Sequence, residues 1–131
     1  MLTNALIKQV AQRAAEAAAQ IPCSMSIAIV DEGANLAYLE RLDGAMIGSV
    51  ETALRKARCA VLFKRPTKAF EEALAGGRMA ILSLPEVMPI EGGIPLIQNG
   101  QLVGAVGVSG GSAQQDGFVA TAAAEAFKKT L

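Results

Sequence analysis

The stretch IPLIQNGQLVGAVGV, residues 94–108, decides the fold that we expect for this chain. Asn99-Gly100 separates two runs that are rich in branched apolar residues. A two-residue type I′ turn needs positive φ at both central positions, which Asn and Gly adopt most easily. The stretch therefore predicts an antiparallel β-hairpin with its turn at residues 99–100.

Other extended segments lie on both sides of a helical middle. The run MSIAIV, residues 25–30, stops at turn-forming residues, and LAYLER, residues 36–41, resumes with extended character. Two antiparallel strands joined by a turn fit this pattern. Residues 78–90 combine two prolines with strong β formers, and they are predicted to form a strand with irregular edges.

Helices are predicted before and between these strands. Apolar residues recur at three- and four-residue steps from Ile7 to Ile21, and Pro22 ends that helix. Ser49 is the expected N-cap of a second helix, which ends at Lys64-Arg65-Pro66. The basic side chains of this region are interpreted as a solvated helical face; they are Lys56, Arg58, Lys64 and Arg65.

Two more helix signals complete the order of elements. Thr67 is expected to cap a short helix that stops at Gly76-Gly77. Ser112, followed three residues later by Gln115, forms a capping box that opens a helix from Ala113 to the C-terminus. The predicted fold class is α/β of the α+β kind: an antiparallel sheet of about five strands flanked by helices, in one domain over residues 1–131.

Composition excludes several classes of function. Apolar residues make up 52% of the 131, and 12 basic side chains balance 12 acidic ones, so neither nucleic acid nor a membrane is an expected partner. The chain has no histidine, the commonest general base and nitrogen ligand, and no metal site is expected. The sequence does not open with the basic and then apolar segments of a signal peptide. It also has no apolar run near the ~18–20 residues that a membrane-spanning helix needs, so we expect a cytoplasmic protein.

The glycine-rich end of the predicted hairpin has two interpretations. Gly107-Val108-Ser109-Gly110-Gly111 matches the G-x-S-x-G nucleophile motif, but without histidine a serine hydrolase is disfavoured. Gly104 and Gly107 could instead let a helix or another strand approach closely. The functional alternative is that Ser109, Gly110 and Gly111 present backbone N–H groups to an anionic group such as a carboxylate.

Two more segments carry residues that suit ligand binding. Glu91-Gly92-Gly93 places an acidic side chain beside two flexible residues, and a plain loop explains it equally well. Arg41 ends a predicted strand and Asp43 lies two residues later. The two opposite charges are interpreted either as a solvated turn or ion pair, or as a site in which Arg41 offers a fork donor to a carboxylate.

As a set, these segments resemble the GlcG/HbpS family of small heme-binding or presumed ligand-binding proteins. The resemblance spans nearly the whole chain and rests on the order of short motifs: residues 25–31, Arg41 to Ala45 with Ser49, Lys56-Ala57, residues 92–96 and residues 103–111 with Gln115-Asp116. It implies a profilin-like or PAS-like fold and a homo-oligomer. It also implies a small-molecule ligand, with heme as one possibility.

The family context suggests a role but leaves the ligand open. Members occur beside glycolate, glycerol and propanediol utilisation genes, as a heme sensor partner, and as the C-terminal domain of some corrinoid adenosyltransferases. Some heme-binding relatives use an axial histidine; here iron would need Met, Cys, Tyr or a hydroxyl oxygen. A small organic ligand held by Arg41, the Gly92-Gly93 loop and the Ser109-Gly111 loop is the alternative.

We therefore expect an oligomeric small-molecule-binding protein that is accessory to small-carbon catabolism. Eight residues form the expected ligand site: Arg41, Asp43, Glu91, Gly92, Gly93, Ser109, Gly110 and Gly111. The competing hypothesis is a small isomerase or lyase acting on a small carboxylate, with proton transfer by Glu91, Asp43, Lys56 or Tyr38.

Overall fold

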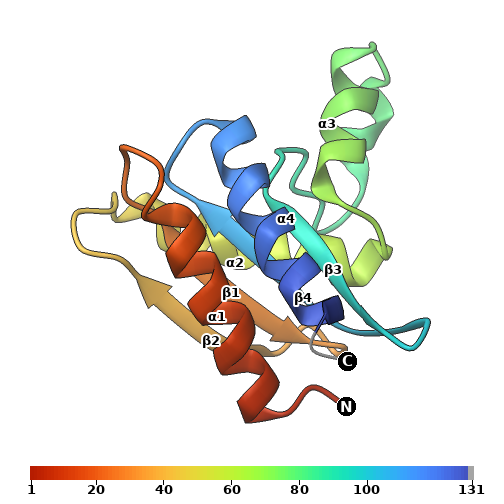
Figure 1. Ribbon diagram of the computed structural model, residues 1–131. Coiled ribbons are helices and arrows are strands. Elements are labelled where there is room, and N and C mark those ends of the chain that lie inside the picture. Colours follow the sequence, from red (N-terminus) through yellow and green to blue (C-terminus); the bar gives the residue numbers. More distant parts are fainter. Residues whose placement is uncertain (130–131) are drawn as a thin grey trace.

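The computed structural model describes the backbone of residues 1–129 and the side chains of residues 1–125. In these residues one antiparallel sheet of four strands, in the order β2-β1-β4-β3, lies between helices (Figure 1). The elements are α1 (Asn4–Ala18), β1 (Ser26–Asp31), β2 (Leu36–Arg41), α2 (Gly48–Phe63), α3 (Thr67–Ala75), the 3-10 helix η1 (Met79–Ser83), β3 (Gly93–Gln98), β4 (Gln101–Ser109) and α4 (Ala113–Lys129).

Alternation along the strands divides the core between the two faces of the sheet. Ile27 and Ile29 of β1 point toward α1 and α4, whereas Ala28 and Val30 point toward α2. The small side chains of the helices let them approach the sheet closely; Gly107 of β4, for example, leaves space for the α2 backbone. This confirms the packing interpretation of that glycine. No helix in the described residues is both long and apolar enough to span a bilayer.

The structure confirms the turns and the capping box that were predicted from local sequence. Asn99 and Gly100 have φ of 52° and 78°, as a type I′ turn requires, and they join β3 to β4. The Ser112 hydroxyl accepts from the Gln115 N–H, and the Gln115 side chain accepts from the Ser112 N–H. Both predicted hairpins and the capping box are therefore present.

The strand predicted over residues 78–90 is wrong. Met79–Ser83 forms the 3-10 helix η1, and the chain continues as a loop in which Glu86 has a φ of 65°. Pro85 and Pro89 lack the N–H groups that a strand ladder needs, which disfavours strand pairing over residues 85–89. The sheet accordingly has four strands in the described part of the chain, not about five.

Two predicted caps have other partners. α2 begins one residue before Ser49, whose hydroxyl bonds to the Met46 carbonyl and to the Ser26 hydroxyl instead. Thr67 is the first residue of α3 and accepts the Gly93 N–H at 2.9 Å. In both cases a hydroxyl that suits a cap makes a tertiary hydrogen bond.

Candidate functional site

A buried ion pair ties the helices on opposite faces of the sheet together. Lys56 Nζ of α2 lies 2.9 Å from Asp116 Oδ2 of α4 and donates to the Val108 carbonyl at 3.0 Å. The other carboxylate oxygen of Asp116 accepts the Gly111 N–H at 2.9 Å. The two side chains are only 1% and 4% exposed. Lys56 is thus not part of a solvated helical face, which corrects that prediction.

Gly92 and Gly93 close over this ion pair. A Cβ on Gly92 would lie 2.6 Å from the Val108 oxygen and 2.9 Å from Lys56 Nζ, and one on Gly93 would collide with the Lys56 carbonyl. Gly92 also has a φ of 136°, a conformation that favours glycine. The close approach at these glycines therefore involves the protein itself, and it fixes the position of Glu91.

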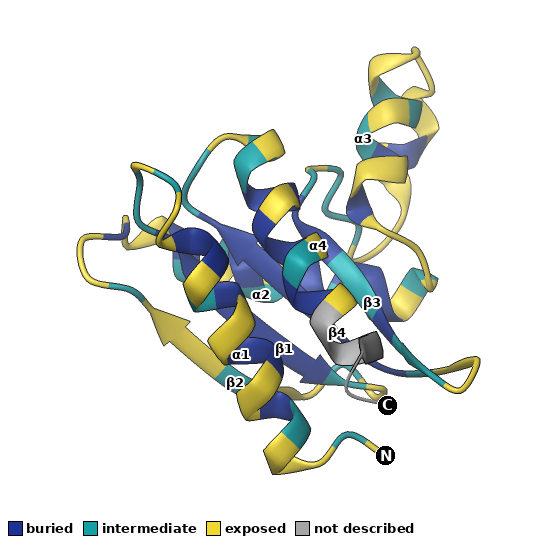
Figure 2. Ribbon diagram, in the orientation of Figure 1, coloured by how far each residue is buried: buried dark blue, intermediate teal, exposed yellow. Residues whose placement is uncertain are grey.

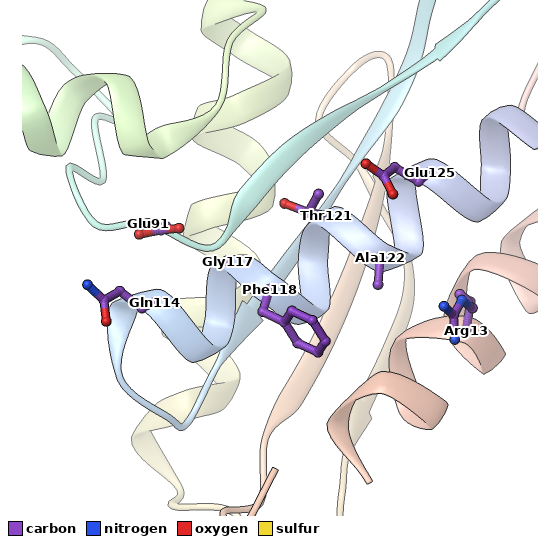
Figure 3. A pocket seen from close by; sticks show the side chains of 8 residues that line it. All are labelled: Arg13, Glu91, Gln114, Gly117, Phe118, Thr121, Ala122 and Glu125. Atoms are coloured by element: carbon purple, nitrogen blue, oxygen red, sulfur yellow. The ribbon is translucent and has the colours of Figure 1, made fainter. Parts of the chain in front are cut away.

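Glu91 borders a surface hollow of about 410 Å³ beside α4 (Figure 3). Its carboxylate lies over Gly117, where a Cβ would collide with it. Its backbone N–H donates to Glu71 Oε1 at 3.0 Å. The hollow, which we call the α4 hollow, is lined by Arg13 of α1, by Glu91, and by Gln114, Gly117, Phe118, Thr121, Ala122 and Glu125 of α4.

A second hollow continues the first around the start of α4. It has a volume of about 470 Å³, and it shares Gln114 and Phe118 with the α4 hollow. The Phe118 side chain between them is 52% exposed, whereas the central strands bury apolar residues such as Ile27, Ile29 and Val106 completely. Hydrophobic and aromatic side chains form most of the lining of small-molecule sites.

The other predicted site residues gather around the start of β1. Ser26 lies opposite Arg41 on one side and opposite Ser109 on the other. A Cβ on Gly110 would meet the Ser24 carbonyl, and the Ser24 hydroxyl donates to the Asp43 carbonyl at 2.6 Å. These residues form a compact group at one end of the sheet.

The strand order separates this group from Glu91 to Gly93. β2 and β3 are the two edges of the sheet, so Arg41 and Gly93 are three strand spacings, about 14 Å, apart. The Gly111 N–H is already bound to Asp116. The eight predicted residues thus share one end of the sheet without surrounding one small cavity, and their role in ligand binding stays a prediction.

Comparison with known proteins settles the family. The family model described as "Haem degrading protein HbpS-like" matches residues 2–125. This chain belongs to the HbpS-like family. Protein GlcG of Escherichia coli strain K12 is 42% identical over 86 residues, which are 66% of this chain and 64% of GlcG, a little under two thirds of that relative.

Solved structures confirm the α+β fold. The crystal structure of HbpS matches with a TM-score of 0.86 and 34% identity, covering 95% of this chain and 88% of that one. A crystal structure of a PduOC–heme complex matches with a TM-score of 0.86 and 29% identity, covering 95% and 94%. The resemblance noted from the sequence is confirmed.

The four proposed proton-transfer residues of this HbpS-like chain have different surroundings. Lys56 is held in its buried ion pair, and Asp43 is exposed. The Tyr38 hydroxyl donates to Glu40 at 2.8 Å, and partial burial together with this carboxylate raises the pKa of Tyr38 to about 12. Glu91 borders the α4 hollow. Among the described residues, no cluster of three or more side chains suits a metal ion.

Sequence reasoning missed Phe118, Arg13 and the buried state of Lys56. Lys56 follows Ala53 by three residues and precedes Ala57 and Ala60 by one and four, so helical spacing alone puts it on the face that packs against the sheet. Nothing comparable marks the α4 hollow, because it forms where α4 lies beside α1 and the loop before β3.

Proposed function

We propose that this protein binds a planar, largely apolar small molecule of the tetrapyrrole class in the α4 hollow. The observation that carries the proposal is the exposed ring of Phe118 between two connected hollows. Burying an aromatic face against a planar ring removes apolar area from water and adds a stacking contribution of about 0.5–1.5 kcal/mol. The PduOC relative that was crystallised with heme supports this class of ligand.

The remaining lining suits such a ligand in shape and in charge. Ala122 has a small side chain, so a flat molecule can approach α4 beside Phe118, whereas the space at Gly117 is taken by the Glu91 carboxylate. Arg13 supplies a guanidinium, and its contact with Glu16 is long, at 3.8 Å, and exposed. A carboxylate on the ligand would bind there, because guanidinium and carboxylate pair well.

The α4 hollow offers contacts to the ring of a heme but few ligands for its iron. The chain contains no imidazole, and the lining of the α4 hollow offers only carboxylate, hydroxyl and amide oxygens as candidate donors. Met25 and Cys59 are fully buried in the core, and the half-buried Cys23 donates its thiol to Gln115 Oε1 at 3.4 Å. We therefore expect binding to depend on the ring and its substituents, with little contribution from iron.

A paired titration tests this proposal. Metal-free protoporphyrin IX is followed by fluorescence and hemin by absorbance, with wild type and with Phe118→Ala. Both compounds should bind wild type with comparable affinity, and Phe118→Ala should weaken both about tenfold, since tenfold corresponds to about 1.4 kcal/mol. Leu82→Ala is the matched control, because Leu82 is equally exposed, at 54%, but lies on η1.

Two results would overturn the proposal. One is tight hemin binding with a sharp Soret band while metal-free protoporphyrin does not bind, since iron would then be the anchor. The other is a Phe118→Ala variant whose affinities equal those of wild type.

Arg13→Gln tests the expected contact with the ligand carboxylates. It should weaken the binding of protoporphyrin IX more than the binding of an esterified porphyrin, which lacks the carboxylates.

A further inference from the structure

Another hollow lies on the arm formed by α3 and η1, which projects from the sheet beside β3 (Figure 1). α3 buries only Thr67 and Phe70, and the rest of this helix is exposed or half-buried (Figure 2). The hollow has a volume of about 310 Å³. We call it the α3 hollow, and its lining includes Phe63, Arg65, Phe70, Arg78, Ile81 and Leu84.

The floor of the α3 hollow is apolar and already packed. The rings of Phe63 and Phe70 meet edge to face, with their centroids 5.2 Å apart. Phe70 and Ile81 are buried together in a small core that is separate from the two cores of the sheet. Because these side chains hold one another in place, the aromatic floor is preformed. Its volume lies near the lower end of ligand pockets, ~300 Å³, which suits a small molecule with one ring.

Two arginines line this hollow from equivalent backbone positions. Arg65 follows Lys64, which ends α2 with a φ of 56°, and Arg78 follows Gly77, which has a φ of 100° at the end of α3. The N–H of each arginine donates to the helix carbonyl five residues earlier, at 3.2 Å and 3.0 Å respectively. These hydrogen bonds fix the backbone from which both guanidinium groups extend.

Neither arginine is neutralised by an acidic neighbour. Arg65 Nε donates to the Phe63 carbonyl at 3.3 Å, and its guanidinium carbon lies 5.4 Å from the centroid of the Phe70 ring. Among the side chains that the structure describes, no Asp or Glu forms an ion pair with Arg65 or Arg78, and none lines the α3 hollow. The α4 hollow, by contrast, is bordered by two glutamates. Two cations above an apolar floor are complementary to an organic anion.

We propose that the α3 hollow binds a small aromatic carboxylate. The ring of the ligand packs against Phe63 and Phe70, and its carboxylate accepts hydrogen bonds from the guanidinium groups of Arg65 and Arg78. The Nη atoms of Arg65 serve this purpose, because its Nε already donates to a carbonyl. Leu84 at the rim is 37% exposed, so the ligand also removes apolar surface of the protein from water.

This inference is independent of the proposed porphyrin site. The α3 hollow shares no lining residue with the α4 hollow, and its volume is smaller. Loss of carboxylate binding and loss of porphyrin binding are therefore separate results, and each can be measured in the absence of the other.

A titration of the isotope-labelled protein with 3-phenylpropionate, followed by backbone amide NMR, tests the proposal. The compound should cause saturable shift changes concentrated at residues 63–84, with residues 114–125 little affected. Two partial probes separate the contributions: 3-phenylpropanamide has the ring without the charge, and acetate has the charge without the ring. Each should bind at least about tenfold more weakly than 3-phenylpropionate.

Arginine variants identify the cations that hold the carboxylate. Arg78→Gln should weaken 3-phenylpropionate about tenfold and leave the binding of 3-phenylpropanamide unchanged. Arg65→Gln should also weaken 3-phenylpropionate. Arg55→Gln is the matched control, because it removes an exposed cation of α2 that does not line the hollow, and it should bind as wild type does. Unchanged amide spectra of α1 and α4 show that each variant is folded.

Several results would each overturn the proposal. One is equal binding of 3-phenylpropionate and its uncharged counterpart, and another is wild-type affinity in both Arg65→Gln and Arg78→Gln, as expected if the arginines only solvate the surface. Shift changes centred outside residues 63–84 would place the ligand elsewhere. The absence of saturable changes up to the solubility limit of 3-phenylpropionate, as when a second copy of the chain covers the hollow, would also contradict it.

Discussion

Replacing Lys56 by methionine should destabilise the protein far more than any change at a neighbouring exposed position. Methionine fills a similar volume, but it leaves the buried Asp116 carboxylate with the Gly111 N–H and without its cation. Removing one partner of a buried ion pair costs about 3–5 kcal/mol. For a chain of this length, that corresponds to a Tm lowered by roughly 10–20 °C.

Urea unfolding followed by circular dichroism measures this free energy, and Arg55 provides the matched control. Arg55 is adjacent in sequence, but its ion pair with Glu51 is exposed, so Arg55→Met should cost less than about 0.5 kcal/mol. Asp116→Asn combined with Lys56→Met should cost less than the sum of the single changes, since the double variant buries no lone charge. A Lys56→Met variant as stable as Arg55→Met would refute the reasoning.

The remaining predictions concern titration, thiol reactivity and packing. Because the pKa of Tyr38 is raised from 10.0 to about 12, the folded state keeps a proton that the unfolded state loses, and stability should fall as pH rises from about 10 to 12. The tyrosinate absorbance of the folded protein should have its titration midpoint near pH 12, and the Glu40→Gln variant should have a lower midpoint. A native midpoint near 10 would contradict this. Burial raises the pKa of the Cys59 thiol, so it should react with a thiol reagent only after unfolding; rapid native labelling would show the site to be open. Gly107→Ala should cost about 1–3 kcal/mol in urea unfolding because its Cβ would lie 2.6 Å from the Ala57 nitrogen, whereas Gly48→Ala, with nothing within 4 Å, should cost nothing; equal stabilities would contradict the packing argument.

The sequence predicted the elements whose formation depends on neighbouring residues. Asn99-Gly100 specifies its turn through the φ angles of two residues, and Ser112 with Gln115 caps a helix within one turn. Where a residue type has both a local and a tertiary use, local reasoning failed. The hydroxyls of Ser49 and Thr67 suit caps, yet they bond to other segments of the chain.

In the candidate site too, some residues could be selected from local sequence and others only from the packing of the chain. Glu91 was selected from the sequence because an acidic side chain stands beside two flexible glycines, and it does border the α4 hollow. Arg13 and Phe118 come from helices about 100 residues apart, and only the packing of the chain brings them to one hollow. The distance between Arg41 and Gly93 likewise depends on the strand order, which no short motif specifies.

The most direct test of the central claim is a titration of the isotope-labelled protein with metal-free protoporphyrin IX, followed by backbone amide NMR. Binding in the α4 hollow predicts shift changes concentrated at Arg13, Glu91 and residues 114–125, with residues 41–43 and 109–110 little affected. Shift changes centred on Arg41, Asp43 and Ser109 instead would place the ligand at the end of β1 and contradict the account.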